Sequence, residues 1–295
     1  MKRILKFVGW TIAAVLAVAG ALAVYIQVRG VPQYAVAAPT LQVQVTPERV
    51  ERGRRWVTML CADCHSNPAT GQLTGRVMTD APAEFGPIVS LNITKHPVKG
   101  IGAWTDGELA YFLRTGIRRD GQYIPPPMVK LAHMSDEDLS SVIAFLRSDN
   151  PLVAPLDVDP PGRSQPSFLV KFLSYVAFKP LPFPERPIPT PPLADRVAYG
   201  RYLVQNMDCY GCHSPDFTTM NLLEPEKTPG YMSGGNTLLD LKGRPVTTAN
   251  LTADEETGIG KWSESDFVRA LTKGFAPGNR TIRYPMGIKI GRAHV

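Results

Sequence analysis

The amino-acid sequence predicts an all-α protein with two tandem domains, joined by a proline-rich linker and preceded by one membrane-spanning helix. Three observations support this prediction. A five-residue cysteine–histidine motif occurs twice, nearly 150 residues apart, and twelve prolines gather in residues 151–192. An uncharged run fills residues 7–28. A length of 295 residues is enough for two domains with separate cores.

The N-terminal segment has the composition of a membrane span. Three basic residues within the first six precede the uncharged run at 7–28. This run of about 22 residues matches the hydrocarbon core of a bilayer, whereas the apolar region of a cleavable signal peptide has 7–15 residues. The small residues Ala21 and Ala23 leave signal-peptide cleavage open as the alternative. We expect residues 1–32 to be an uncleaved anchor, with the basic end in the cytoplasm.

Each cysteine–histidine motif has the pattern Cys-x-x-Cys-His, which is typical of covalent c-type haem attachment. The two thiols lie one helical turn apart and can add to the porphyrin vinyl groups, while the following imidazole takes an axial position on the iron. The two copies use all four cysteines of the chain and predict two covalent haems c. The predicted attachment residues are Cys61, Cys64, His65, Cys209, Cys212 and His213.

Three other interpretations of the motif fit the sequence less well. A thioredoxin-like cysteine pair follows a strand in a βαβ unit, and no strand pattern precedes either copy. A structural zinc site needs four ligands in one place, whereas each copy offers three. A disulfide between cysteines three residues apart would be strained and would cross-link almost nothing. Repetition of the motif with its histidine favours haem.

The first domain is predicted to span residues 45–149. An amphipathic helix at 46–58 leads into the motif, and the Gly- and Pro-rich segment 66–102 is predicted to be a loop over the haem. A second helix begins with a capping box at Thr105 and ends at Gly116. A third helix, at 135–148, has capping signals and one apolar face.

Two methionines are the predicted second axial ligands. Aligning the two halves of the sequence on Trp104 and Trp262 gives an offset of 158 residues. At this offset, Met128 and Met286 are the only two methionines that align with each other. Both follow a proline, which holds the backbone extended and allows a side chain to face the haem opposite the histidine. This alignment does not test His133 or Met134 as axial ligands.

The linker is predicted to span residues 150–193 and to be a semi-rigid, extended connector. It contains an apolar stretch at 167–179 that is long enough for three helical turns. This helix could lie in the membrane interface near the anchor, but we expect it to pack in the groove between the two domains.

The second domain is predicted to span residues 194–295 and to be truncated at its C-terminal end. Only nine residues follow Met286, so no counterpart of the helix at 135–148 is present. Residues 290–295 also match the translation of a widely used sequencing adapter. We therefore expect the natural sequence to differ beyond about Lys289.

Several segments resemble the membrane-bound multihaem cytochrome c subunits of periplasmic alcohol and aldehyde dehydrogenases. The resemblance covers both haem motifs and about 200 residues, and it implies all-α cytochrome c domains, His/Met ligation and electron transfer. Those subunits commonly carry three haem motifs, whereas this chain has two. The segments that carry the resemblance are Gly200-Arg201-Tyr202-Leu203 before the second motif, Asn250-Leu251-Thr252, Gly258-Ile259-Gly260 with Trp262, and Tyr284-Pro285-Met286.

We expect a non-catalytic electron-transfer subunit of an oxidoreductase complex, because iron with His and Met ligands has no vacant position for substrate. It would lie on the periplasmic side of the bacterial inner membrane. It would relay electrons from a dehydrogenase or quinol to a terminal oxidase or soluble cytochrome. The alternative is a dihaem redox enzyme, such as a peroxidase or a thiosulfate-oxidising cytochrome. The four propionates of two haems offset the formal charge of +6, and we expect no nucleic-acid partner.

Overall fold

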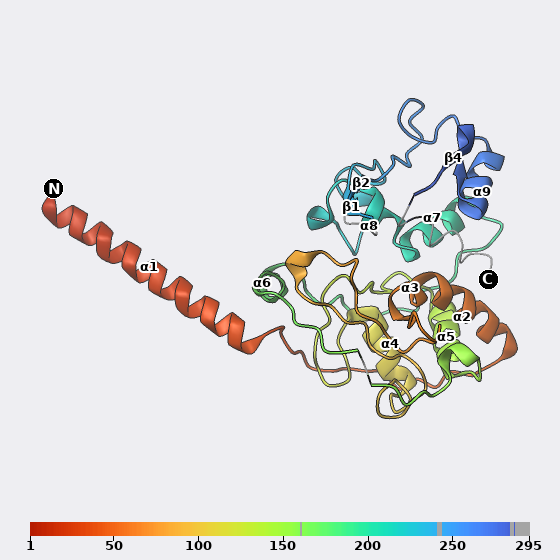
Figure 1. Ribbon diagram of the computed structural model, residues 1–295, viewed down its shortest axis with the longest axis horizontal. Coiled ribbons are helices and arrows are strands. Elements are labelled where there is room, and N and C mark those ends of the chain that lie inside the picture. Colours follow the sequence, from red (N-terminus) through yellow and green to blue (C-terminus); the bar gives the residue numbers. More distant parts are fainter. Residues whose placement is uncertain (160, 241–243, 284–285, 287–295) are drawn as a thin grey trace.

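The computed structural model describes residues 1–159, 161–240, 244–283 and 286 (Figure 1). Tyr284, Pro285, Lys289 and the adapter-like residues 290–295 lie outside the described residues. The described part is mainly helical, which confirms the predicted all-α class. Its α-helices are α1 (Lys2–Arg29), α2 (Pro47–Leu60), α3 (Ala62–His65), α4 (Asp106–Thr115), α5 (Asp136–Arg147), α6 (Phe168–Val176), α7 (Arg196–Asn206), α8 (Cys209–His213) and α9 (Glu264–Lys273).

The strands are short and form two separate antiparallel pairs. Strand β1 (Thr237–Leu239) pairs with β2 (Pro245–Thr247), and β3 (Phe275–Ala276) pairs with β4 (Arg280–Thr281). Among the described residues, five single turns of 3-10 helix lie in the connections. They are η1 (Ala83–Phe85), η2 (Pro151–Val153), η3 (Phe217–Thr219), η4 (Pro225–Lys227) and η5 (Pro277–Asn279).

Helix α1 projects away from the body of the molecule (Figure 1). In the described part of the chain it is the one helix long and apolar enough to cross a membrane. The chain is fixed to the body directly after α1 ends. The amide of Tyr34 donates to the carbonyl of Gly121 at 2.9 Å, and Val31 and Tyr34 pack against the buried Tyr123.

Helices α2 and α5 cross closely and form the centre of the N-terminal unit, by which we mean residues 45–149. A Cβ atom at Gly53 would lie 1.9 Å from the carbonyl oxygen of Ser141, so only glycine allows this approach. Val57, Val142 and Phe145 are buried in the same core. The predicted helices at 46–58, 105–116 and 135–148 correspond to α2, α4 and α5.

In the C-terminal unit, residues 194–283, helix α9 begins with a capping box and ends at a glycine, as α4 does in the N-terminal unit. Thr105 and Glu108 form the capping box of α4, and Ser263 and Asp266 form that of α9. Gly116 and Gly274 end the two helices in the left-handed conformation. All three pairs are 158 residues apart, which is the offset that the tryptophans predicted.

The two helices differ in how well they are covered. Leu109 on α4 is 2% exposed, whereas the equivalent Phe267 on α9 is 44% exposed. Helix α5 covers α4 in the N-terminal unit. In the part of the chain that the structure describes, no counterpart of α5 lies on α9, so its apolar side chains face outward.

Residues 150–193 lie along the N-terminal unit. Tyr123 donates its hydroxyl hydrogen to the carbonyl of Lys179 at 3.2 Å, and the amide of Leu181 donates to the carbonyl of Thr115 at 3.3 Å. The amide of Ile188 donates to the carboxylate of Asp136 at 3.1 Å. These bonds give a proline-rich segment defined partners at several points along its length.

The apolar stretch at 167–179 forms helix α6, but the expectation that it packs between two domains is wrong. Helix α6 lies against α1 and η1. The amide of its N-cap residue, Ser167, donates to the carbonyl of Phe85 at 3.0 Å, and its hydroxyl donates to the carbonyl of Glu84 at 2.6 Å. These two bonds fix the start of the helix on η1.

Candidate haem-attachment sites

The first motif lies where α2 passes into the short helix α3. Cys61 ends α2 and begins α3, and the amides of Cys64 and His65 donate to its carbonyl at 3.2 and 2.9 Å. The two cysteines are therefore one turn apart, as covalent attachment to one porphyrin requires. All four cysteine residues of the chain have intermediate exposure.

Both motif histidines are held by a backbone carbonyl. Nδ1–H of His65 donates to the oxygen of Leu91 at 2.7 Å, and Nδ1–H of His213 donates to the oxygen of Ala249 at 2.8 Å. A carbonyl only accepts, so each Nδ1 carries the hydrogen and each Nε2 keeps its lone pair. Leu91 and Ala249 are 158 residues apart. The repeat thus preserves the contact that orients a metal-binding imidazole.

The protonation of the two imidazoles also suits iron. Burial lowers the pKa of His65, and nearby Arg76 lowers it further, while the hydrogen bond to Leu91 opposes the shift. Burial likewise lowers the pKa of His213 against the bond to Ala249. Both rings are therefore neutral near pH 7, which is the form that binds a metal.

The electrostatics of Cys61 argue against a thioredoxin-like pair. Burial raises the pKa of its thiol to about 12, and the neighbouring Cys64 adds to the shift. Reactive redox cysteines have a lowered pKa instead. In the part of the chain that the structure describes, no three His, Cys, Asp or Glu side chains gather as a metal-ion site.

An asparagine turn follows each carbonyl that holds a histidine. Asn92 Oδ1 accepts from the amide and the hydroxyl of Thr94 at 2.8 and 2.7 Å, and Asn250 Oδ1 makes the same two bonds with Thr252 at 2.9 and 2.7 Å. These turns fix the backbone that presents the carbonyls to the imidazoles. The two units therefore share a supporting structure as well as a motif.

Two buried polar atoms lie beside the first motif without a partner among the described residues. They are Thr74 Oγ1 and Asn92 Nδ2, on two segments joined by the bond from the Ile93 amide to the Leu73 carbonyl. An unpartnered buried polar atom is costly. A bound group with acceptor atoms, such as the carboxylates of a haem, would satisfy them, so the residues around this motif fit a haem.

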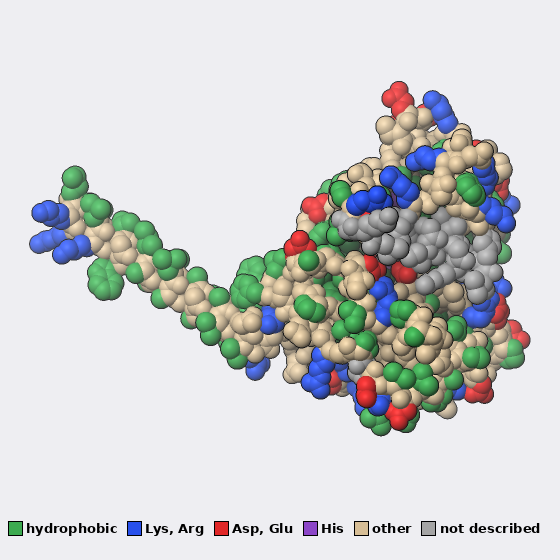
Figure 2. All heavy atoms as spheres, viewed as in Figure 1, with side chains coloured by type: hydrophobic (Ala, Val, Ile, Leu, Met, Phe, Trp, Pro, Cys, Tyr) green, Lys and Arg blue, Asp and Glu red, His purple; other side chains and the backbone are tan. Residues whose placement is uncertain are grey.

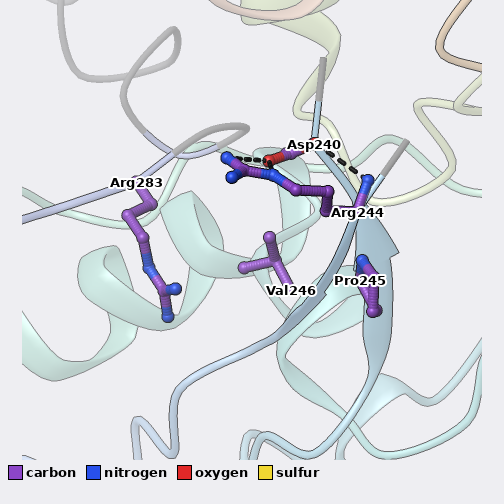
Figure 3. A pocket seen from close by; sticks show the side chains of 5 residues that line it. All are labelled: Asp240, Arg244, Pro245, Val246 and Arg283. Carbon is purple, nitrogen blue, oxygen red and sulfur yellow. Dashed lines mark hydrogen bonds and ion pairs between the residues drawn. The ribbon is translucent and has the colours of Figure 1, made fainter. Parts of the chain in front are cut away.

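A cavity of about 450 Å³ lies beside the β1–β2 hairpin of the C-terminal unit (Figure 3). Pro245 and Val246 give it an apolar wall, and Arg283 adds a positive charge. Arg244 also lines it, but its guanidinium is paired with Asp240 at 2.7 Å. This chemistry suits an apolar group that carries negative charge. Strand β2 leads directly to Ala249, the carbonyl partner of His213.

The two candidate methionine ligands have different surroundings. Met128 follows three prolines and packs, partly buried, on the core of the N-terminal unit, to which Cys61 and Trp104 also belong. Met286 is partly buried, and its neighbours 284–285 and 287–295 are outside the described residues. Both iron–sulfur bonds therefore stay predictions.

Two residues that the repeat could not test have other roles. Met134 is fully buried in the core of the N-terminal unit. His133 Nε2–H donates to the carbonyl of Leu222 at 2.8 Å and so contacts the C-terminal unit. The carbonyls of Leu91 and Ala249 carry no residue-type signal in the sequence, although the 158-residue offset pairs them.

No protein-family model matches the chain. It is 30% identical over 226 residues to the fructose dehydrogenase cytochrome subunit of Gluconobacter japonicus, covering 72% of this chain and 42% of that protein. It is 30% identical over 230 residues to the cytochrome c subunit of a quinone alcohol dehydrogenase of Gluconobacter oxydans, covering 72% and 44%. It is 31% identical over 228 residues to a diheme cytochrome c-type protein of Cereibacter sphaeroides, covering 74% and 70%. The chain thus spans less than half the length of the first two relatives.

Proposed function

The chain belongs to the c-type cytochrome family that includes the cytochrome subunits of bacterial dehydrogenases, and we propose that it transfers electrons through two covalently bound c-type haems. One observation carries the proposal. The histidine of each Cys-x-x-Cys-His motif is neutral and donates Nδ1–H to a backbone carbonyl. The repeat places these two carbonyls in equivalent positions. The dihaem relative supports the number of haems.

The residues of this chain divide the work of holding the cofactor. Cys61 and Cys64 in the first unit, and Cys209 and Cys212 in the second, attach the two haems. His65 and His213 would hold the iron through Nε2, together with Met128 in the first unit and Met286 in the second. When bound, the haem supplies reversible one-electron chemistry of iron.

The domain boundaries form part of the same proposal. Residues 45–149 and 194–295 each hold one haem, and residues 150–193 connect them. Tyr202 of α7 packs in the core of the N-terminal unit. The connection between the units therefore includes side-chain contacts besides the linker.

Helix α1 anchors the protein in the bacterial inner membrane, with both haem units in the periplasm. Support comes from the length and composition of α1 and from the basic residues before it. Two of the relatives are named as cytochrome subunits of dehydrogenases. We therefore propose a dehydrogenase or quinol as electron donor, and an oxidase or soluble cytochrome as acceptor.

Absorption and spin-state spectroscopy of the purified ferric protein test this function. We expect low-spin iron at both haems, with a sulfur-to-iron charge-transfer band. Met128→Ala and Met286→Ala should each remove about half of that band, because each methionine serves one iron. Met232→Leu is the matched control and should retain the full band. High-spin iron at either haem in the unmodified protein would support a dihaem redox enzyme instead.

A further inference from the structure

Helix α6 exposes an apolar face. Val170 and Ser174 are buried against the body, while four large apolar side chains on the other side are 41% to 58% exposed. The rings of Phe168 and Phe172 stack with their centroids 6.4 Å apart. In Figure 2 these side chains form a hydrophobic patch where α1 meets the body. The exposed side chains are Phe168, Leu169, Phe172 and Val176.

The position of α6 relative to α1 indicates what covers this face. The rings of Tyr25 and Tyr175 lie 6.3 Å apart, and Lys171 Nζ donates to Gln27 Oε1 at 3.1 Å. Tyr25 and Gln27 lie within four residues of Arg29, the last residue of α1, which is about 6 Å along a helix. Helix α6 therefore lies level with the end of α1.

Both helices are fixed to the N-terminal unit. Ser167 binds η1 through its amide and its hydroxyl, and Tyr34 binds Gly121 five residues after α1 ends. The apolar face of α6 therefore keeps its place beside α1. If α1 spans a bilayer, the same rigid body brings this face to the bilayer surface.

We propose that α6 lies in the lipid interface, with Phe168, Leu169 and Phe172 among the acyl chains of the leaflet where α1 ends. This inference rests on the proposed anchoring by α1. Lipid covers the apolar face of α6, because this face is continuous with α1, a helix of membrane-spanning length. Tyr25 and Tyr175 supply the amphipathic aromatic rings typical of the membrane–water boundary, and Lys171 lies beside them.

Photo-crosslinking in vesicles tests the proposal on the full-length holoprotein. p-Benzoylphenylalanine is introduced in place of Phe172, of Leu16 within α1, or of Val197 on α7. Val197 is a matched control because it is an apolar helical residue with 75% exposure on the C-terminal unit. Each variant is reconstituted in phosphatidylcholine vesicles and irradiated, and adducts are identified by mass spectrometry.

The expected result is a lipid adduct at positions 16 and 172 and none at position 197. An adduct at position 16 with none at 172 would overturn the docking of α6 and leave the anchor standing. A covalent dimer through position 172 would overturn it in favour of a second copy of the chain. Absence of lipid at both 16 and 172 would overturn the anchor, and the docking of α6 with it.

Discussion

The hydroxyl of Tyr202 donates a hydrogen bond to Oδ2 of Asp138 and so joins the C-terminal unit to the first turn of α5. Asp138 is fully buried. Its other oxygen accepts from Trp56 Nε1 at 2.7 Å and from the guanidinium of Arg52. The ring of Tyr202 also meets Trp56 edge to face, with centroids 6.2 Å apart. One carboxylate thus connects α2, α5 and α7.

We expect Tyr202→Phe to destabilise the protein by about 1.5–3 kcal/mol, because it removes a hydrogen bond to a buried charged acceptor. Urea unfolding followed by circular dichroism measures the change. Tyr199→Phe is the control, since in the described part of the chain its hydroxyl has no hydrogen bond, and it should change stability by less than about 0.5 kcal/mol. Equal losses in the two variants would contradict the role of the Tyr202 hydroxyl.

Asp138 should make the stability depend on acid pH. Burial raises its pKa, but hydrogen bonds from Arg52, Tyr202 and Trp56 outweigh burial and hold the pKa below its ordinary value. A depressed folded-state pKa gives stability that is present above about pH 4, the unfolded value, and lost as pH falls through the folded value. Between about pH 5 and pH 3, Asp138→Asn should therefore lose less stability than the unmodified protein. Parallel pH profiles would exclude this contribution.

Gly53→Ala should destabilise the N-terminal unit by about 1–3 kcal/mol, because the added methyl group forces α2 away from α5. Gly200→Ala is the matched control on α7. A Cβ atom there has no neighbour within 4 Å, so the helix propensity of alanine should leave stability unchanged or raise it by up to about 1 kcal/mol. Thermal unfolding of both variants distinguishes a steric effect from a general intolerance of alanine.

Each motif should bind its haem independently. Replacing both cysteines of a motif, Cys61→Ser with Cys64→Ser or Cys209→Ser with Cys212→Ser, should reduce covalently bound haem from two to one per chain, since no thiol is left to form a thioether at that site. The pyridine haemochrome assay measures this ratio. Tyr210→Phe changes a position between the cysteines of the second motif and should retain two haems. A chain that still binds two haems covalently after Cys61→Ser with Cys64→Ser would disprove the assignment of the first site.

Local signals predicted helix α4 well, and α9 has the same signals 158 residues later. Their capping boxes and terminal glycines lie within one turn of the residues they cap, so the short sequence segments contain the information. The bond from Tyr202 to Asp138 could not be predicted in this way, because the two residues are 64 positions apart and meet only through helix packing.

The candidate haem sites show the same difference between local signals and contacts made by distant residues. The motif spacing predicts the cysteines and histidines as haem-attachment residues, whereas the carbonyls of Leu91 and Ala249 are backbone groups with no residue-type signal. Helix α6 was recognised from its apolar run, but its place beside α1 depends on the bonds of Ser167 to η1. Contacts between residues far apart in the sequence are therefore the part that composition and periodicity do not reveal.

The bond from Tyr34 to Gly121 has a consequence for how such a carrier is used. It leaves at most four residues between the end of α1 and the first attachment to the body. With α1 in a bilayer, as proposed, so short a tether would give the N-terminal unit no reach of its own, unlike a domain that swings between donor and acceptor on a long flexible arm. Redox partners of the proposed carrier would then have to travel to it, either by lateral diffusion in the bilayer or through the surrounding solution.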